Sequence, residues 1–200
     1  MRAKARARRI KMILTDVDGT LTDGRLLVLP DGQEVKGYHV RDGLAVLMAQ
    51  LAGLKLGIIT GKTSPALERR AARLKIEDLY QGAIDKVPVF RRILDKHGLR
   101  AEEVAFIGDD LGDLEVLKSA GLSAAVADAH PAVLRSVHYV CRRKGGDGAF
   151  REFVDFILGA QKKWGLITER FAQIFNRNEQ AKPSFEGGRG GHQPEDLPRV

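Results

Sequence analysis

Short apolar runs alternate along the chain with longer stretches in which apolar residues recur at helical spacing. The apolar runs have the length of β-strands and lie at residues 10–15, 56–60, 79–81, 104–107, 122–126 and 137–141. The stretches with helical spacing lie at residues 43–52, 64–74, 86–97, 113–120, 131–136 and 148–158. Strands that alternate with helices are typical of βαβ units around a parallel sheet. The pattern therefore predicts an α/β fold, a doubly wound parallel sheet with helices on both faces.

One segment interrupts this alternation. Residues 25–40 read RLLVLPDGQEVKGYHV, with two strand-like halves around Pro30, Asp31 and Gly32. A cluster of turn-forming residues between two β-forming runs predicts a hairpin. We therefore expect a β-hairpin inserted after the first strand.

The net charge of +7 is concentrated at the start of the chain. Residues 1–11 hold six basic residues and no acidic one, whereas the remaining residues hold 27 basic and 26 acidic residues. We predict a basic, disordered leader at residues 1–9, one domain with a C-terminal helix at 10–175, and a disordered tail at 176–200, where Gly, Pro and charged residues predominate. A basic arm attracts phosphate non-specifically, but no motif that reads a nucleic-acid groove accompanies it.

Composition also limits the compartment. No apolar run approaches the roughly 18 residues that span a membrane, and Cys141 is the only cysteine, so an internal disulfide is impossible. We expect a soluble, cytoplasmic protein that binds neither a membrane nor a specific nucleic acid.

Polar residues follow three of the predicted strands. They are Asp16 and Asp18 after the first strand, Thr60 after the second, and Asp109, Asp110 and Asp113 after the strand that ends at Ile107, while Lys86 begins a helix between them. Ligands of an open α/β sheet bind beyond the carboxyl ends of the strands, so we expect these side chains to converge there. Clustered carboxylates favour a hard cation such as Mg²⁺, and a lysine beside them balances a phosphate group. The set indicates phosphoryl transfer.

Each of these features alone has other interpretations. An Asp-x-Asp pair also occurs in metal-dependent glycosyltransferases, in calcium loops and on solvated turns, and the acids in GDDLGD, residues 108–113, also suit a helix N-terminus. A signalling receiver domain also combines strand-end acids with a Thr and a Lys. Its phosphoacceptor aspartate follows a middle strand, however, whereas here the corresponding strand ends in Thr60, Gly61 and Lys62 with no aspartate. A non-catalytic binding module of the same fold is a further alternative.

The motifs together resemble those of the haloacid dehalogenase superfamily of phosphohydrolases. The matching segments are DVDGTLT (16–22), IITG (58–61), Lys86 and GDDLGD (108–113), in the order of the four family motifs. The resemblance implies that Asp16 is the nucleophile, that Asp18 is the general acid and base, and that Thr60, Gly61 and Lys86 bind the phosphoryl group. It also implies that Mg²⁺ is held by Asp16, Asp109 and the backbone carbonyl of Asp18, with Asp110 and Asp113 in support.

Within this superfamily the chain is similar to the capless branch of 3-deoxy-D-manno-octulosonate 8-phosphate phosphatases. The similar segments are YHVRDGLAV (38–46), ITGKTSPALERRAARLKI (59–76), LYQGAIDK (79–86), GDDLGDLEVL (108–117) and KGGDGAFRE (144–152). The resemblance implies an eight-carbon keto sugar acid phosphate as substrate, a homotetramer in which the hairpin and the C-terminal region contact neighbouring subunits, and a place in lipopolysaccharide synthesis. A nine-carbon keto acid 9-phosphate or a broader range of sugar phosphates stays open.

The chain departs from this branch at two positions. Lys62 stands where the branch usually has Arg, and Asp147 stands between glycines where a cation is expected. Arg41, Arg70 and Arg151 remain as cations that match the branch and that we expect to bind an anionic substrate, although structural ion pairs are an equal alternative for each.

Overall fold

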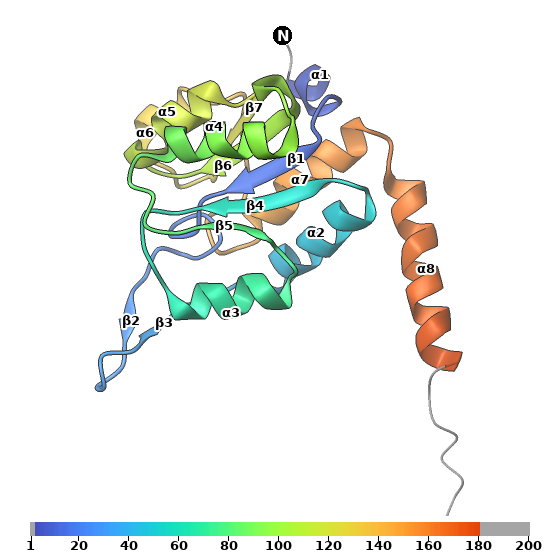
Figure 1. Cartoon of the computed structure of the whole chain (residues 1–200), viewed down its shortest axis with the longest axis horizontal. Coiled ribbons are helices and arrows are strands. Elements are labelled where there is room, and N and C mark those ends of the chain that lie inside the picture. The colour runs from blue at the N-terminus through green and yellow to red at the C-terminus, as the bar shows by residue number, and fades with distance from the viewer. Residues whose placement is uncertain (1–2, 181–200) are drawn as a thin grey trace, which may run out of the picture.

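The computed structural model describes residues 3–180, with side chains to residue 174, and is built around a six-stranded sheet (Figure 1). The strands are β1 (Met12–Thr15), β4 (Lys55–Ile59), β5 (Asp78–Tyr80), β6 (Val104–Gly108), β7 (Leu122–Ala125) and β8 (Tyr139–Val140). Their order is β5-β4-β1-β6-β7-β8, and all neighbouring pairs are parallel. The chain winds outward from β1 to β5 and then from β6 to β8, so the topological switch point lies between β1 and β6.

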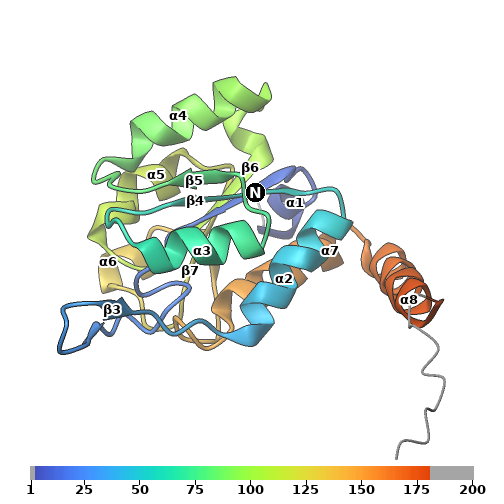
Figure 2. The same ribbon diagram turned by 60° about the horizontal axis from the view of Figure 1, so that its bottom comes forward.

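Helices cover both faces of the sheet, as the sequence pattern predicts (Figures 1 and 2). One face carries α2 (Val40–Leu51), α3 (Pro65–Arg73) and α7 (Ala149–Ala160). The other carries α4 (Lys86–His97), α5 (Leu114–Ser119) and α6 (Pro131–Leu134), with short 3₁₀ turns η1 (Ala101–Glu103) and η2 (Leu111–Asp113) around β6. Because both faces are covered, every residue of β1 and β6 is buried, which explains their continuous apolar runs.

The predicted hairpin is present as a separate two-stranded antiparallel sheet. It consists of β2 (Leu27–Val28) and β3 (Glu34–Val35) and projects from the body of the molecule (Figure 1). Between β1 and β4 the chain forms only this hairpin and α2, and between β4 and β5 it forms only α3. The carboxyl ends of the central strands are therefore not covered by a separate domain within these segments.

The leader prediction is wrong for the residues that the structure describes. Ala3–Ala7 form the helix α1, which packs on α7 and β7. Ala7 is completely buried, and the Arg6 guanidinium donates a hydrogen bond of 2.7 Å to the carbonyl of Gly121. The alternating alanines favour a helix and are small enough for close packing, which the charge count alone does not reveal. Residues 1–2 lie outside the described part.

The C-terminal helix extends further than predicted. It is α8 (Trp164–Gln180), and it projects from the rest of the fold beyond α7 (Figure 1). Ile167 is buried, and Arg170 donates a hydrogen bond to the carbonyl of Leu51 at the end of α2. The predicted tail thus begins inside α8, and its remainder, residues 181–200, lies outside the described residues. Within residues 3–180, no helix is both long and apolar enough to cross a membrane.

Candidate active site

The turn after β1 presents the first two aspartates. Asp16 directly follows the strand, is 6% exposed, and continues the sheet because its backbone amide donates a hydrogen bond of 3.0 Å to the carbonyl of Ile107. Gly19 then adopts a φ of +89°, a conformation that L side chains rarely adopt. A Cβ atom on Gly19 would lie 2.1 Å from Oδ2 of Asp109, so only glycine allows the carboxylate of Asp109 to come so close to the turn.

The turn after β6 presents two more carboxylates. Asp113 is 2% exposed, and its Oδ2 accepts hydrogen bonds from the backbone amides of Asp109 at 3.0 Å and Asp110 at 3.4 Å. The Thr20 hydroxyl donates to Oδ1 of Asp109 at 3.1 Å and so links the two turns. Asp110 itself is exposed and caps η2 through the amide of Leu111. The sequence thus places one acid of this turn towards solvent and two towards β1.

Asp16, Asp109 and Asp113 form one cluster. Each offers a carboxylate oxygen, and these oxygens all lie within 4.8 Å of one another. Lys86, at the first position of α4 and 7% exposed, donates hydrogen bonds of 2.6 Å to Oδ1 of Asp16 and 2.5 Å to Oδ1 of Asp113. The cluster therefore holds three carboxylates and one ammonium group at the switch point of the sheet.

The cluster is poised for a further positive charge. Burial raises the pKa of Asp16 from 3.8 to about 6 despite the opposing effect of Lys86. Burial and the charges of Asp16 and Asp113 raise the pKa of Asp109 to about 7. Although burial alone lowers the pKa of Lys86, the two carboxylates that it contacts raise it above its ordinary value. Three carboxylates, of which Asp16 and Asp113 are buried and Asp109 is half-buried, leave a negative excess beside one ammonium, and a divalent cation would relieve it.

The donor set fits Mg²⁺. This ion prefers oxygen ligands and is commonly bound by one or two carboxylates, with water and substrate phosphate completing its coordination. Of the three predicted metal-binding residues, Asp16 and Asp109 share the cluster with Asp113. The Asp18 side chain instead faces Lys36, which leaves the predicted role of its backbone carbonyl untouched.

Thr60 follows β4 and is 3% exposed. Its amide donates to the carbonyl of Tyr80 at 3.0 Å, and its carbonyl accepts from the amide of Ala83 at 2.9 Å, so its backbone is fixed by the next strand and loop. Because Thr15 pairs with Ile58, the ends of β1 and β4 lie side by side. Gly61 comes next and is exposed, as expected for a backbone that a ligand can approach.

The three predicted arginines do not gather at the carboxylate cluster. Arg41 and Arg151 line a separate hollow of about 810 Å³ beside the start of α7, and the Arg151 guanidinium pairs with Asp155 at 2.7 Å. Arg70 instead lies over the ring of Tyr38, 5.5 Å from its centroid. Burial and the charge of Asp18 raise the pKa of Tyr38 to about 12.

Lys36 and Tyr38 are site residues that the sequence patterns did not single out. Lys36 follows β3, its side chain is 4% exposed, and its ammonium contacts Oδ1 of Asp18. The hairpin thereby brings a cation to the turn after β1, residues 16–22, which is called the catalytic turn below because it carries the predicted nucleophile Asp16. Neither spacing nor periodicity signals this contact, because it depends on how the hairpin folds back onto the turn after β1.

A glycine-rich loop before α7 supports the catalytic turn. The amide of Gly146 donates to the carbonyl of Thr20 at 3.1 Å, and that of Gly145 donates to Oδ1 of Asp128 at 3.0 Å. A Cβ atom on Gly145 would lie 1.8 Å from the carbonyl oxygen of Gly19. The loop therefore touches the catalytic turn backbone to backbone, which only glycine permits here.

Known proteins share both this fold and much of this sequence. The model of the haloacid dehalogenase-like hydrolase family matches residues 71–153. The 3-deoxy-D-manno-octulosonate 8-phosphate phosphatase KdsC of Yersinia pestis is 45% identical over 158 residues, which cover 79% of this chain and 84% of the relative. KdsC of Escherichia coli K12 is 43% identical over 159 residues, covering 80% and 85%. The chain belongs to this phosphatase family of haloacid dehalogenase-like hydrolases.

A solved structure of the family is also similar. The 3-deoxy-D-manno-octulosonate 8-phosphate phosphatase of Moraxella catarrhalis, in complex with a magnesium ion, a phosphate ion and a KDO molecule, superposes with a TM-score of 0.81 at 34% identity, covering 86% of this chain and 97% of that one. Its ligands belong to that protein. The chain's membership of the phosphatase family confirms the predicted α/β fold. It also agrees with the carboxylate cluster, which fits a divalent cation.

Proposed function

We propose that the chain is a Mg²⁺-dependent phosphatase that hydrolyses 3-deoxy-D-manno-octulosonate 8-phosphate to the free sugar acid and phosphate. The observation that carries the proposal is the position of Lys86 Nζ, which bridges Asp16 and Asp113 beside Asp109. A nucleophilic carboxylate, a phosphate-binding cation and a donor set for Mg²⁺ are thereby within one cluster. The similarity to phosphatases of this substrate supports the choice of sugar acid.

Asp16 acts as the nucleophile in the first step. One of its carboxylate oxygens attacks phosphorus, the ester bond between phosphorus and the sugar oxygen breaks, and an aspartyl phosphate forms. Asp18 donates a proton to the departing sugar oxygen. Covalent catalysis replaces one difficult displacement with two easier ones. The hydrogen bond from the backbone amide of Asp16 to the carbonyl of Ile107 fixes the position of the nucleophile at the end of β1.

Water releases the phosphate in the second step. The Asp18 carboxylate takes a proton from a water molecule, whose oxygen attacks phosphorus and breaks the bond to Asp16. Asp18 thereby returns to its protonated state, and Asp16 to its carboxylate. The Asp18 side chain is 27% exposed, so water reaches it, whereas the Asp16 side chain is 8% exposed. This difference suits a proton carrier beside a shielded nucleophile.

Lys86 and the residues that follow β4 hold the transferring phosphoryl group. Thr60, Gly61 and Lys86 bind its oxygens, and the charge of Lys86 balances the phosphate. Asp16, Asp109 and the Asp18 carbonyl would hold Mg²⁺, while Asp113 orients Lys86 and the backbone after β6. Mg²⁺ bound there would neutralise negative charge on the phosphoryl oxygens during the transfer.

Recognition of the sugar acid carboxylate is assigned to cations that lie outside the carboxylate cluster. Arg70 is favoured because it lies over Tyr38, whose ring lies near Asp18. Arg41 and Arg151 line the neighbouring hollow, which is suited to an anion only if the Arg151 contact with Asp155 opens. Lys62, one of the two positions at which the sequence departs from the branch, is exposed, and a substrate carboxylate can reach it.

The active form in this proposal is a homotetramer assembled through the hairpin. Leu26, Leu27, Val28 and Leu29 are 44–63% exposed on the hairpin, a run of apolar surface unusual for an isolated monomer. Burial of this surface between copies would also hold Lys36 against Asp18. Light scattering of the purified chain should give four times the monomer mass, and Val28→Asp should lower it; a monomeric wild type would refute this assembly.

The proposed location is the cytoplasm, and the proposed pathway is lipopolysaccharide synthesis. A single buried cysteine is compatible with a reducing compartment. Fractionation of the source cells tests the location, and loss of the gene should cause the octulosonate 8-phosphate to accumulate. Recovery of the protein in another fraction would contradict the location.

Phosphate release from a panel of esters tests the function. The panel contains 3-deoxy-D-manno-octulosonate 8-phosphate, nine-carbon keto acid 9-phosphates and hexose phosphates, each with Mg²⁺ and with EDTA. We expect preference for the octulosonate ester, loss in EDTA, and loss in Asp16→Asn. Equal activity on all esters would contradict the substrate but not the chemistry, and Mg²⁺-independent activity or an active Asp16→Asn would contradict the mechanism.

A further inference from the structure

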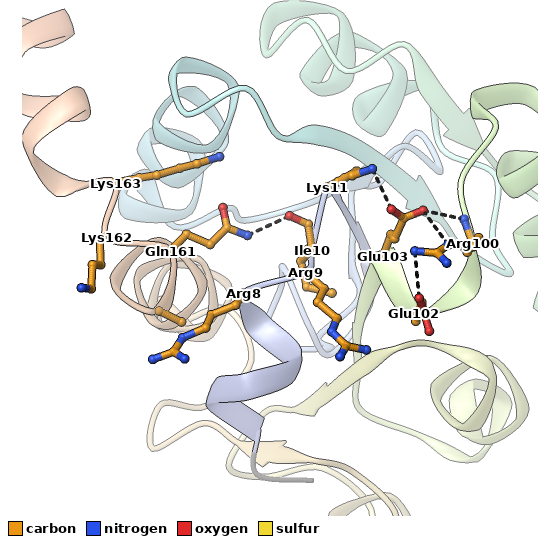
Figure 3. Close-up of a pocket in the computed structure, with 11 residues that line it drawn as sticks. Arg8, Arg9, Ile10, Lys11, Arg100, Glu102, Glu103, Gln161, Lys162 and Lys163 are labelled. Carbon is orange, nitrogen blue, oxygen red and sulfur yellow. Dashed lines mark hydrogen bonds and ion pairs between the residues drawn. The ribbon is translucent and has the colours of Figure 1, made fainter.

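A second hollow lies at the edge of the sheet opposite the carboxylate cluster. Its volume is about 910 Å³, and it is lined by the segment that leads into β1, the segment that leads into β6, and the residues that follow α7 (Figure 3). The carboxylate cluster lies beyond the carboxyl ends of β1 and β6, whereas this hollow lies before their amino ends. It is therefore a different site from the one that holds the phosphatase chemistry.

The hollow is strongly basic. Six cationic side chains line it, namely Arg8, Arg9, Lys11, Arg100, Lys162 and Lys163. Only two acids face them, and both are engaged, since Glu103 pairs with Lys11 at 2.7 Å and Glu102 pairs with Arg100 at 2.9 Å. The net positive charge of the lining favours a ligand with several negative charges.

Three of these cations are free to bind a ligand. Among the side chains that the structure describes, no carboxylate lies within ion-pair distance of Arg8, Arg9 or Lys162, and all three are exposed. Lys163 is different, because its ammonium donates to the carbonyl of Ala52 at 2.7 Å and burial lowers its pKa. The free cations come from two separate segments that meet at the hollow.

The backbone that carries the free cations is fixed. The Gln161 side-chain amide donates a hydrogen bond of 2.7 Å to the carbonyl of Ile10 (Figure 3) and one of 3.0 Å to the carbonyl of Ala7. These bonds tie the arginine segment to the end of α7. Lys162, just after α7, adopts the left-handed conformation, and the amide of Lys163 donates a hydrogen bond of 3.0 Å to the carbonyl of Leu158. A cation on a fixed backbone loses less conformational entropy on binding.

Favourable contact with helix dipoles does not account for the whole arrangement. Basic residues after a helix complement its negative end, and Arg8 and Lys162 each follow a helix. This effect acts on each helix separately. It gives no reason for the ends of two helices to be tied together so that their cations line one concave surface.

The lining also indicates the class of ligand. It contains no aromatic side chain, so the stacking surfaces that bind single-stranded nucleic acid bases are absent from it. Its volume is within the range of small-molecule sites, and guanidinium groups match phosphate oxygens in geometry. We propose that this hollow binds a small polyphosphate, a linear di- or triphosphate either free or as part of a nucleotide, through Arg8, Arg9 and Lys162.

Calorimetric titration of the full chain in EDTA with inorganic tripolyphosphate tests this site directly. We expect saturable binding that weakens with salt, and a loss of at least about tenfold in affinity for the combined Arg8→Ala, Arg9→Ala and Lys162→Ala variant. Arg91→Ala with Arg92→Ala on α4 is the control, because both arginines are exposed outside the hollow, and it should bind as the wild type does. Circular dichroism of each variant checks folding.

Two further titrations distinguish the source of the phosphate and the competing class of ligand. If ATP binds as tightly as tripolyphosphate, the site recognises the phosphates alone. If ATP binds more tightly, the site recognises a nucleotide. Both outcomes support the site. A wild-type chain that fails to bind, a triple variant that binds as the wild type does, or an oligouridylate that binds more tightly than tripolyphosphate would overturn the proposal. No step requires hydrolysis, so the outcome is independent of the proposed phosphatase activity.

Discussion

The carboxylate of Asp42, in the first turn of α2, accepts a hydrogen bond of 2.8 Å from the backbone amide of Arg151 in the first turn of α7. The N-cap residue of α7 is Gly148, which has no side chain to cap the helix. Asp42 therefore supplies the cap from a different helix. This contact fixes the start of α7 and, through it, the glycine loop that touches the catalytic turn.

Substitution at Asp42 should separate its capping role from its charge. Asp42→Ala should lower the free energy of unfolding by about 1–2 kcal/mol, measured by urea denaturation. Asp42→Asn keeps an oxygen that can accept the hydrogen bond. Burial raises the pKa of Asp42, which means that burying its charged form costs free energy, and the neutral amide of Asn avoids that cost. At pH 8 the Asn variant should equal or exceed the wild type. Equal destabilisation by Ala and Asn would contradict the cap.

Gly145→Ala should damage the catalytic turn. Its Cβ atom would meet the carbonyl oxygen of Gly19 at 1.8 Å, so one of the two backbones must move. We expect the free energy of unfolding to fall by at least about 2 kcal/mol, measured by urea denaturation. We also expect a large fall in kcat, measured by phosphate release. Gly165→Ala in α8 is the matched control, because a Cβ there meets nothing within 4 Å. A Gly145→Ala variant as stable and active as this control would contradict the close contact.

The metal-free protein should become less stable as pH rises. Asp16 and Asp109 have pKa values of about 6 and about 7 in the folded chain, against 3.8 when unfolded. The folded state thus binds protons more tightly than the unfolded state. The free energy of unfolding therefore decreases as the pH rises from the unfolded pKa values to the folded ones. In EDTA, Asp109→Asn should melt several degrees above the wild type at pH 8, and the gap should shrink at pH 5. A gap that does not change with pH would show that ionisation of Asp109 is not the cause.

Mg²⁺ should reverse this pH dependence. The ion binds the ionised carboxylates of the cluster, so at pH 8 its addition should raise the melting temperature of the wild type, and the rise should increase with ion concentration. Asp109→Asn removes one ligand charge and should show little or no rise. An equal rise in both proteins would mean that the ion binds elsewhere.

Lys36 should position Asp18 for proton transfer. Lys36→Met should lower kcat/KM by about tenfold to a hundredfold, mainly through kcat, because the buried ammonium contacts the Asp18 carboxylate. Lys36→Arg should restore part of the rate, and Lys55→Met, which removes an exposed lysine at the start of β4, should leave the rate unchanged. An effect on KM alone would assign Lys36 to substrate binding instead.

Much of the fold and the composition of the carboxylate cluster could be predicted from the sequence. The apolar runs of β1 and β6 are continuous because both faces of the sheet are covered, and this burial is visible in the residues themselves. The strand-end acids Asp16 and Asp109 converge because the carboxyl ends of parallel strands share one edge. Both inferences need only local pattern and the geometry of a parallel sheet.

Contacts between elements were decided by the tertiary structure alone. Lys86 bridges Asp16 to Asp113, Lys36 reaches Asp18 from the hairpin, and the predicted arginines are divided between Tyr38 and a separate hollow. The docking of α1 reversed the prediction of a disordered leader because packing of its alanines outweighs the charges between them. The sequence by itself determined which chemical groups stand at the ends of the strands. The contacts that these groups make depend on how whole helices and strands are placed relative to one another. The periodicity of hydrophobic residues carries no information about that placement.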